Sequence, residues 1–532
     1  MDAMQPTYVN PLVLPDYPNL PVKHPDPAAT PGAGWGHEQK KLLHEQDLLA
    51  RILGPDNPHN RGPWGGEMAR PSFSEPAAND VRATADPSVL YHEGKWYLYC
   101  TSGMVYHSED FVHWIPHPDT SWMPISAPMA PTVACFRGRF YASANSVPLH
   151  VSDSPVGPWK LVGDWTLPSG EEMLCGDVML FADDDDRLYL YWGLGSAIFG
   201  SELDPERPNH LLTEPKILID FNSRNAWERG GEHNENWRDG CLEGSWMYKR
   251  NGVYYLTYSA AGTSFSTYSM GAYIGTSPLG EFHLQRRNPI SVSTSGLVRG
   301  GGHGSIVDGP NGTIWCFYTI PVGIDHIYER RIGMDPCGID ENGELYALTG
   351  SETPQFAPGV LAHPELGNSA GLDVCNYFLP HGASSHQYGR DSLYAIDGVL
   401  HTWWEPLPED QKPVLETSTM SYTYVSGVRI IWKDVGLDFQ AGILPGPYRY
   451  RVEAQPPESG EWTVLVDASD NTVDLTVDYR TFPPFLASKI RLVILGAPTG
   501  LIPGVIDFSV FGESAAKRDF EESCSKELEA SV

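Results

Sequence analysis

The stretch VRATADPSVLYHEGKWYLYCTS, residues 81–102, holds two strand-like runs and one carboxylate in front of the first. Residues 89–91 form an apolar run, Gly94 marks a turn, and residues 96–99 form an aromatic run. Aromatic and β-branched residues fit a half-buried pleated strand, and a glycine between two such runs suits a hairpin turn. Asp86 precedes the first run. It is either a turn residue or a carboxylate that points into a cavity.

The same unit, a turn followed by an aromatic-rich strand, occurs five times in the chain. The copies are GKWYLYCTS (94–102), GRFYASANS (138–146), DRLYLYWGL (186–194), NGVYYLTYS (251–259) and NGTIWCFYT (311–319). Steps of 44, 48, 66 and 60 residues separate the equivalent positions Trp96, Phe140, Leu188, Tyr254 and Ile314. Blade-sized repeats of hairpins favour a five-bladed β-propeller, and an irregular β-sandwich is the alternative. The longest step contains a polar insertion, residues 220–240, which we expect at the rim of a site.

Composition limits the classes of partner. The 532 residues include 36 basic and 67 acidic side chains, a formal net charge of −31, together with 53 glycines and 46 prolines. A strongly acidic chain is a poor ligand for nucleic acid or an anionic membrane, so we expect neither as partner. No apolar run is long enough to span a membrane, and the N-terminus does not resemble a secretion signal. Scattered cysteines without CxxC pairs favour a reducing compartment, so a cytoplasmic location is expected, with secretion as the alternative.

The chain divides by composition into four parts. Residues 1–75 are expected to form an N-terminal extension packed on the propeller, with one helix over 37–53. Residues 76–362 form the predicted propeller, residues 372–513 a second β-rich domain, and residues 514–532 a charged tail. In the second domain, YAIDGVLHTWWEP (394–406) and IDFSVFG (506–512) resemble the discoidin-like (factor V/VIII type C) β-sandwich. The predicted fold class is therefore all-β, a five-bladed propeller followed by a jelly-roll sandwich.

Three carboxylates stand before the first strand of a repeat: Asp86, Asp177 and Glu243. Each alone is most simply a turn or capping residue. Because the innermost strands of a propeller surround one central channel, however, equivalent residues of different blades converge in space. The shared position of the three acids therefore predicts a common site.

Four short motifs resemble glycoside hydrolase family 43: ADP (85–87), GDVMLFADDD (176–185), LEG (242–244) and GHGSIV (302–307). The resemblance implies that Asp86 is the general base and Glu243 the general acid. It also implies that Asp177 raises the pKa of this acid and orients its side chain. It also implies that His303 helps to hold a metal ion or water in the channel. Two departures concern the sugar pocket, since Ser245 replaces a usual proline and Met129 replaces a usual tryptophan.

The resemblance implies an inverting mechanism, in which one carboxylic acid protonates the leaving oxygen and one carboxylate activates water. We expect an exo-acting hydrolase that releases terminal α-L-arabinofuranose from plant polysaccharides or oligosaccharides. β-D-Xylosidase and β-D-galactofuranosidase activities are the alternatives within the class. From another class, the chain would be a carbohydrate-binding protein without catalysis.

Further residues are predicted around the site. We expect three further residues, Trp114, Met129 and Arg299, to bind substrate. Two of them have an alternative: Trp114 would also suit the hydrophobic layer between blades, and Arg299 would also suit an exposed surface position. Trp122 is a second aromatic of the same kind. No cofactor is expected to be required; the one metal considered is a structural Ca²⁺ in the channel, held by oxygens and water with His303 acting through water.

Overall fold

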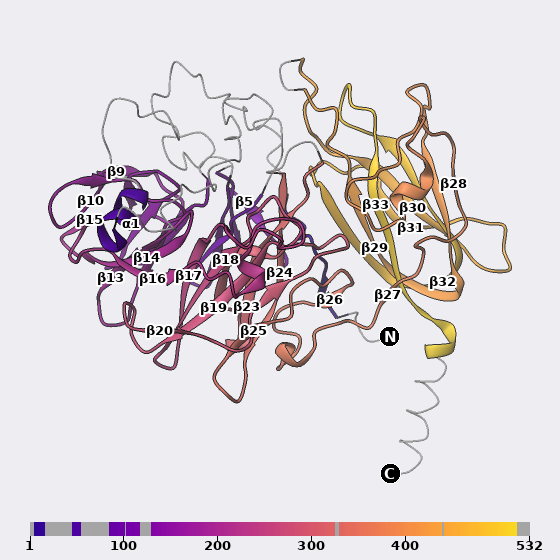
Figure 1. Ribbon diagram of the computed structural model, residues 1–532. Helices are drawn as coiled ribbons and strands as arrows, with labels where there is room; N and C mark the ends of the chain where they lie inside the picture. Colours follow the sequence, from indigo (N-terminus) through magenta and orange to yellow (C-terminus); the bar gives the residue numbers. More distant parts are fainter. Residues whose placement is uncertain are drawn as a thin grey trace, which may run out of the picture. The chain divides into compact units, whose positions relative to one another are not determined.

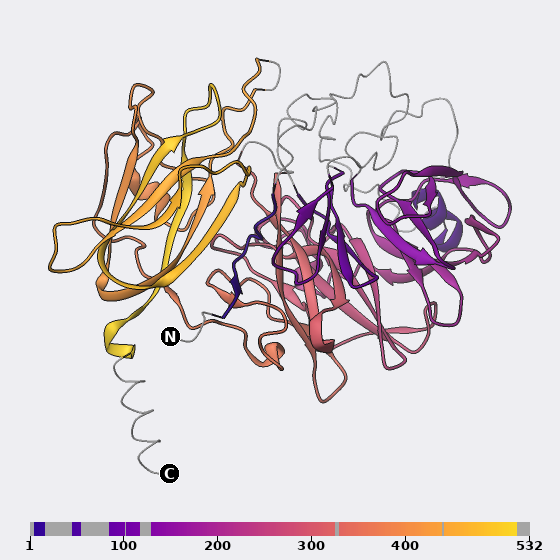
Figure 2. The same cartoon turned by 180° about the vertical axis from the view of Figure 1, so that it is seen from behind.

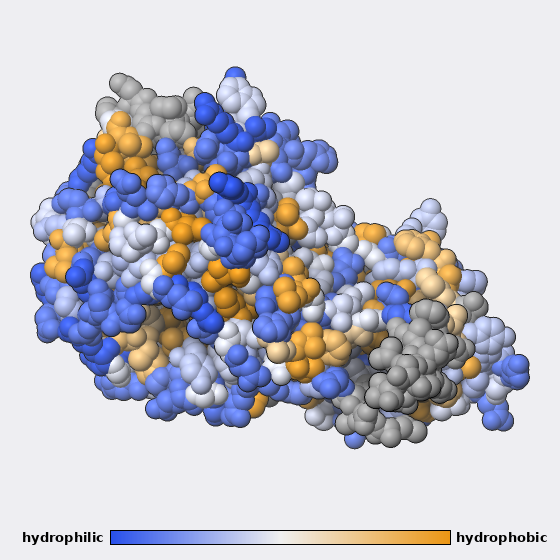
Figure 3. Space-filling view, turned by 90° about the horizontal axis from the view of Figure 1, so that it is seen from below, coloured by the Kyte–Doolittle hydropathy of each residue, from blue (hydrophilic) through white to orange (hydrophobic). Residues whose placement is uncertain are grey.

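The computed structural model describes residues 5–15, 45–54, 84–101, 103–117, 129–324, 329–438 and 441–518. These residues belong to two compact units (Figure 1). The larger unit comprises residues 20–350 and 361–367, and the C-terminal unit comprises residues 1–19, 351–360 and 368–532. No helix among the described residues is long and apolar enough to cross a membrane. On the face seen in Figure 3, hydrophilic side chains predominate and apolar ones form small separate groups.

The described part of the larger unit contains five sheets arranged as in a propeller. One strand of each sheet contacts its equivalents in the neighbouring sheets, so that β2, β6, β12, β17 and β22 close a ring in cyclic order. We call these five the first strands, and the strands paired with them along the chain the second strands. We call this unit the propeller unit and its sheets blades 1 to 5 (Figures 1 and 2). The five aromatic-rich copies found in the sequence coincide with the second strands, β3, β7, β13, β18 and β23. The predicted repeat is therefore confirmed as one copy per sheet.

The blades are bounded as follows. Blade 1 consists of β2 (Ser88–His92), β3 (Lys95–Tyr99), β4 (Val105–Ser108) and β5 (Ile115–Pro116), and blade 2 of β6 (Thr132–Phe136), β7 (Arg139–Ser143), β8 (Leu149–Ser152) and β9 (Lys160–Gly163). Blade 3 consists of β10 (Trp165–Thr166), β11 (Glu172–Met173), β12 (Met179–Ala182), β13 (Leu188–Trp192), β14 (Ala197–Asp204), β15 (Arg207–Leu211) and β16 (Lys216–Asp220). Blade 4 consists of β17 (Glu243–Arg250), β18 (Val253–Ala260), β19 (Ser269–Gly275), β20 (Phe282–Leu284) and β21 (Ser291–Val292). Blade 5 consists of β22 (Gly302–Asp308), β23 (Ile314–Pro321), β24 (Arg330–Ile339) and β25 (Leu345–Ala347).

Apolar side chains fill the layers between neighbouring blades. Tyr99 and Val105 of blade 1, for example, pack with Val133 and Phe140 of blade 2 in one buried cluster. Alternating strand residues point to opposite faces, so each central strand contributes to the layers on both of its sides. The polar residues that lead into the first strands therefore lie at the ends of these layers, around the ring.

Helix α1 (Glu45–Leu53) covers the core of blade 3. Its residues Leu48 and Leu49 are buried in the same cluster as Trp165 and Phe199. The sequence predicted a helix over 37–53, of which the structure describes residues 45–53.

The polar insertion, residues 220–240, is held against blade 4. It contains the short helix η2 (Ala226–Glu228), in which the buried carboxylate of Glu228 accepts a hydrogen bond of 2.7 Å from the Tyr258 hydroxyl. Farther along, Ser266 donates to Glu232 at 2.6 Å and Thr267 donates to the carbonyl of Gly231 at 2.8 Å. The insertion therefore has a defined structure before the chain enters β17.

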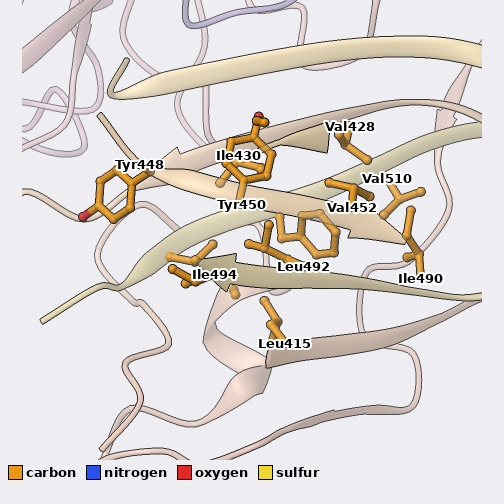
Figure 4. Close-up of a cluster of buried hydrophobic side chains, with 14 of the residues drawn as sticks. Leu415, Val428, Ile430, Tyr448, Tyr450, Val452, Ile490, Leu492, Ile494 and Val510 are labelled. Atoms are coloured by element: carbon orange, nitrogen blue, oxygen red, sulfur yellow. The ribbon is translucent and has the colours of Figure 1, made fainter. Parts of the chain in front are cut away.

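The C-terminal unit is built on one curled sheet. Two long strands, β29 (Val414–Trp432) and β32 (Val477–Gly496), pair along their lengths, and shifts of register interrupt the pairing between Ser418 and Thr423 and again before Gly427. Such irregularities bend strands, so the sheet folds over its own core. The side chains labelled in Figure 4 belong to one buried cluster and come from β29, β32 and the neighbouring strands, apart from Tyr448, which lies just before one of these strands. The remaining strands are β27 (Asp373–Val374), β28 (His381–Ala383), β30 (Arg449–Gln455), β31 (Thr463–Ala468) and β33 (Val505–Ser514). The short helix η5 (Ser392–Ala395) also belongs to this unit.

Residues 5–15 belong to the C-terminal unit. Strand β1 (Thr7–Tyr8) pairs with β26 (Gln355–Phe356), and the fully buried guanidinium of Arg429 donates to the carbonyls of Asn10 at 2.7 Å and Glu352 at 2.9 Å. Residues 7–8 therefore pair with residues 355–356, which the sequence had assigned to the propeller. That residues 1–75 as a whole form an extension packed on the propeller stays a prediction.

Candidate active site

Each blade is entered through one residue in the left-handed backbone region. The φ angles are 51°, 48°, 44°, 57° and 36° at Asp86, Ala130, Asp177, Gly244 and His303, in the order of the blades. Residues with side chains rarely adopt this conformation, and a shared occurrence at five entrances marks a common turn into the ring. Asp86, Asp177 and His303 are thus structural equivalents. The sequence reading put Glu243 at the same point, whereas the structure places it one residue earlier, beside Gly244.

His303 lies between two of the predicted carboxylates. Its Nδ1 is 3.4 Å from Asp86 Oδ1 and 3.4 Å from Asp177 Oδ2. The ring packs directly on Gly244, where an added Cβ would lie 2.7 Å from His303 Cγ. Burial opposes the charged imidazolium, but the charges of Asp86 and Asp177 outweigh burial and raise the pKa of His303 to about 9. The imidazolium therefore links blades 1, 3 and 5 through charge.

Asp86 is held as a carboxylate. The hydroxyl of Thr101 donates to Oδ2 at 2.5 Å, and Arg330 Nη1 donates to Oδ1 at 2.9 Å. Burial acts to raise the pKa of Asp86, yet the charges of Arg330 and His303 and the hydrogen bonds to the carboxylate bring the pKa below its ordinary value. Thr101 also accepts a hydrogen bond of 2.9 Å from the N–H of Ala130, which fixes the hydroxyl between blades 1 and 2.

Glu243 has the opposite protonation preference. It is buried, and burial together with the negative charge of Asp177 raises its pKa to about 7. The thiol of Cys241 lies 3.5 Å from Oε2. The site therefore combines an ionised aspartate with a glutamic acid that is mostly protonated below about pH 7. This division of roles is the one that general acid–base chemistry needs.

Several residues of this site were missed in the sequence. Arg330 reaches Asp86 and also donates to Thr263 at 3.3 Å, and Thr319 accepts from the N–H of Asp86 at 2.9 Å. A signal for the hydroxyls was present. Thr101 and Thr319 stand near or at the ends of the first and fifth copies, where the second strand runs alongside the entrance of the first. For Arg330 we find no comparable pattern.

Trp114 is not part of this site. Its side chain is buried, its indole N–H donates to the carbonyl of Phe111 at 2.9 Å, and its ring packs against Phe111 and Phe317. The predicted role in substrate binding is therefore wrong for Trp114, because the ring is used to close the hydrophobic layer between blades 1 and 5. Trp122 lies outside the described residues.

The other two predicted substrate ligands are placed as follows. Met129 is half-buried immediately before Ala130, and its carbonyl accepts a hydrogen bond of 2.8 Å from Asn145. Arg299 donates to the carbonyls of Pro321 at 3.4 Å and Val322 at 3.1 Å, and burial lowers its pKa. Contact of either side chain with a sugar stays a prediction.

The donors around His303 do not form a direct metal site. Among the described residues, no group of three or more His, Cys, Asp or Glu side chains has an arrangement that would hold a metal ion. Nδ1 of His303 faces two carboxylates as a hydrogen-bond donor would. A Ca²⁺ in the channel, with His303 acting through water, stays a prediction.

Comparison with known proteins identifies the family. Residues 80–354, more than half of the chain, match the sequence profile of glycosyl hydrolases family 43. The chain belongs to this family. As a family 43 member it is a glycoside hydrolase that acts on carbohydrate.

Curated relatives in family 43 have several activities. A β-D-galactofuranosidase of Aspergillus niger is 25% identical over 310 residues, which are 49% of this chain and 81% of the relative. A xylosidase/arabinosidase of Butyrivibrio fibrisolvens is 28% identical over 263 residues, which are 43% of this chain and 47% of that protein. A xylosidase/arabinosidase of Humicola insolens is 24% identical over 375 residues, 64% of this chain and 59% of that protein.

Solved structures of glycoside hydrolases are also similar to this chain. One described as a glycoside hydrolase is 18% identical and covers 80% of this chain, with a TM-score of 0.45 and 97% of its own chain matched. A thermostable family 43 glycoside hydrolase is 23% identical, with a TM-score of 0.44, and the match covers 52% of this chain and 96% of that one.

Proposed function

We propose that this family 43 enzyme is an exo-acting, inverting α-L-arabinofuranosidase with Asp86 as general base, Glu243 as general acid and Asp177 as the residue that raises the pKa of the acid. The observation that supports these roles is the opposite protonation of two buried carboxyl groups around His303. The pKa of Asp86 is lowered by Arg330 and His303 against burial, whereas that of Glu243 is raised to about 7 by burial and Asp177.

The proposed reaction is a single displacement. Asp86 takes a proton from a water molecule as the water oxygen bonds to the anomeric carbon, and the bond from that carbon to the leaving oxygen breaks. Glu243 gives its proton to the leaving oxygen, so the products are a free sugar and an alcohol. Asp177 keeps Glu243 protonated before the reaction, and Arg330 and Thr101 hold the carboxylate of Asp86 in place. Water and two carboxyl groups suffice for this step, so no cofactor is required.

The choice of sugar rests on the relatives. Two of them are named xylosidase/arabinosidase and one is named β-D-galactofuranosidase. We take α-L-arabinofuranose, on a plant polysaccharide or its oligosaccharides, as the first candidate and the other two sugars as alternatives. The replacement of the usual tryptophan by Met129 makes the sugar-binding wall of this chain less aromatic than the family pattern.

Hydrolysis of aryl α-L-arabinofuranoside, β-D-xyloside and β-D-galactofuranoside by wild type and Glu243→Ala tests the proposal. We expect turnover of the arabinofuranoside, and a loss of at least about a hundredfold in the variant, since general acid catalysis contributes about 10²–10⁴. Glu281→Ala, which changes an exposed acid on the same blade, is the matched control and should keep full activity. Failure of the wild type to hydrolyse any of the three would favour a binding protein or a different sugar.

For the C-terminal unit we propose a discoidin-like β-sandwich. The curled sheet and its single buried core are compatible with that architecture. A cytoplasmic location likewise stays a prediction.

A further inference from the structure

Tyr268 is a buried polar residue that the proposed reaction has not yet used. It lies immediately before β19 in blade 4, is fully buried, and its hydroxyl has no direct hydrogen-bond partner among the described residues. A buried phenol hydroxyl normally has a partner, because leaving it without one is destabilising. An unpartnered hydroxyl at this depth therefore indicates a group that bonds in another state of the site.

The ring of Tyr268 is fixed against the centre of the site. It packs on Gly302, where an added Cβ would lie 2.4 Å from Tyr268 Cε1. The next residue, His303, packs its own ring on Gly244, directly beside Glu243. The absence of side chains at Gly302 and Gly244 permits these two close contacts of Tyr268 and His303.

The hydroxyl of Tyr268 interacts with Glu243. This interaction lowers the pKa of Glu243, against burial and Asp177, which raise it. Burial and the charges of Glu243 and Asp86 raise the pKa of Tyr268 itself well above its ordinary value, so the phenol keeps its proton and acts as a donor. In the structure, however, the Tyr268 hydroxyl and the Glu243 carboxyl group do not have the geometry of a direct hydrogen bond.

We propose that Tyr268 is a positioning residue for the general acid, whose hydroxyl forms a hydrogen bond to the Glu243 carboxylate as the acid gives up its proton. The inference rests on the proposed function. When Glu243 protonates the leaving oxygen, a negative charge appears in a buried site that already holds Asp177 and Asp86. Hydrogen bonds to an ionised group are about twice as strong as neutral ones, so the bond is stronger after proton transfer than before it.

Other groups around Glu243 do not replace this donor. The Cys241 thiol, 3.5 Å from Oε2, is a weak donor, and His303 has its Nδ1 directed at Asp86 and Asp177. The negative charge of Asp177 raises the pKa of Glu243, so this carboxylate accepts rather than donates. Asp86, which takes the proton of the attacking water, is held by Thr101 and Arg330. Tyr268 is therefore the strong donor available to the new carboxylate among the titratable groups that act on it.

Tyr268→Phe tests this role, because it keeps the ring on Gly302 and removes only the hydroxyl. We expect kcat to fall about tenfold or more on an oligosaccharide, whose leaving group needs full protonation, and much less on a dinitrophenyl glycoside. KM should change little. The basic limb of kcat/KM should move to higher pH, since the interaction that lowers the pKa of Glu243 is lost.

Tyr258→Phe is the matched control, since it removes a hydroxyl from a fully buried tyrosine of the same blade that bonds to Glu228 instead. It should leave the basic limb unchanged. An equal loss on both leaving groups, an unmoved basic limb, or a higher KM with unchanged kcat in Tyr268→Phe would overturn the proposal. The proposed function is judged separately. If wild type hydrolyses the glycosides and Glu243→Ala does not, it stands whatever Tyr268→Phe shows.

Discussion

At the scale of single residues, the site depends on how two buried carboxyl groups acquire different protonation states. Burial raises the pKa of both groups, so the difference between their pKa values must come from the neighbouring side chains. Asp86 forms an ion pair with Arg330 at 2.9 Å, which favours the carboxylate. The neighbour with the largest effect on the pKa of Glu243 is Asp177, whose negative charge favours the protonated acid. A charge of opposite sign beside one group and of like sign beside the other is sufficient to separate a base from an acid.

This separation predicts the pH dependence of the reaction. Activity requires ionised Asp86 and protonated Glu243, so kcat/KM should fall as the pH rises through about 7, and fall again below the ordinary aspartate pKa of 3.8. In Asp177→Asn the like charge is gone, the pKa of Glu243 falls, and the basic limb should move to lower pH. Asp185→Asn, on an exposed turn of the same blade, should leave both limbs in place. A basic limb that stays near pH 7 in Asp177→Asn would contradict the assigned role of Asp177.

Much of the site is readable from the sequence, and the limit has a physical cause. Asp86 and Asp177 were found because they directly precede predicted strands, which is local information. Arg330 was not found, because its partner Asp86 is 244 residues away in the chain and nothing near Arg330 marks it. Tyr268 has the same difficulty, since its neighbours in space belong to other strands. The repeats predict where blades begin, but not which side chains from different blades meet.

At the scale of elements, the turn into each first strand decides where the side chains of the ring lie. Five entrances share a left-handed residue, and the chain uses an aspartate, an alanine, an aspartate, a glycine and a histidine there. In blade 4 the entrance is Gly244, so the functional acid stands one residue earlier, as the first residue of β17. The glycine leaves room for the ring of His303.

Gly244→Ala should therefore damage both stability and activity. A Cβ at this position meets His303 Cγ at 2.7 Å, and φ of +57° is strained for alanine, at a cost of roughly 1–2 kcal/mol before the clash is counted. We expect a lower midpoint of thermal unfolding and a loss of kcat of more than about tenfold, because His303 is displaced from Asp86 and Asp177. Gly252→Ala separates the two effects. Its φ is +77° and nothing lies within 4 Å of the added Cβ, so it should lose stability but keep kcat. Equal kcat in the two variants would show that the packing of His303 on Gly244 is irrelevant to the reaction.

At the scale of the whole molecule, the two units use the chain differently. The propeller unit is nearly continuous in sequence, whereas the C-terminal unit takes residues from the N-terminus and from the segment after residue 350. The contact between Arg429 and Asn10 joins residues 419 positions apart. No composition or periodicity around Asn10 indicates this pairing, so the sequence alone did not predict it.

Arg429 should be decisive for the stability of the C-terminal unit. Its side chain is fully buried, pairs with Asp507 at 3.0 Å, and donates to Ser509 at 2.8 Å as well as to the carbonyls of Asn10 and Glu352. Arg429→Ala would leave the buried carboxylate of Asp507 without its counter-charge, and loss of one partner of such a pair costs about 3–5 kcal/mol. Denaturant unfolding followed by hydrogen exchange of β1 and β26 should show early opening of this strand pair.

Arg451→Ala provides the comparison, because its ion pair with Asp467 in the same unit is exposed and such pairs contribute at most about 1 kcal/mol. Hydrolysis should continue in both variants, since none of the proposed catalytic residues belongs to this unit. If Arg429→Ala unfolds no earlier than Arg451→Ala, the buried pair is not what retains the N-terminal segment. The paired backbones of β1 and β26 would then be sufficient to hold residues 5–15 in the C-terminal unit.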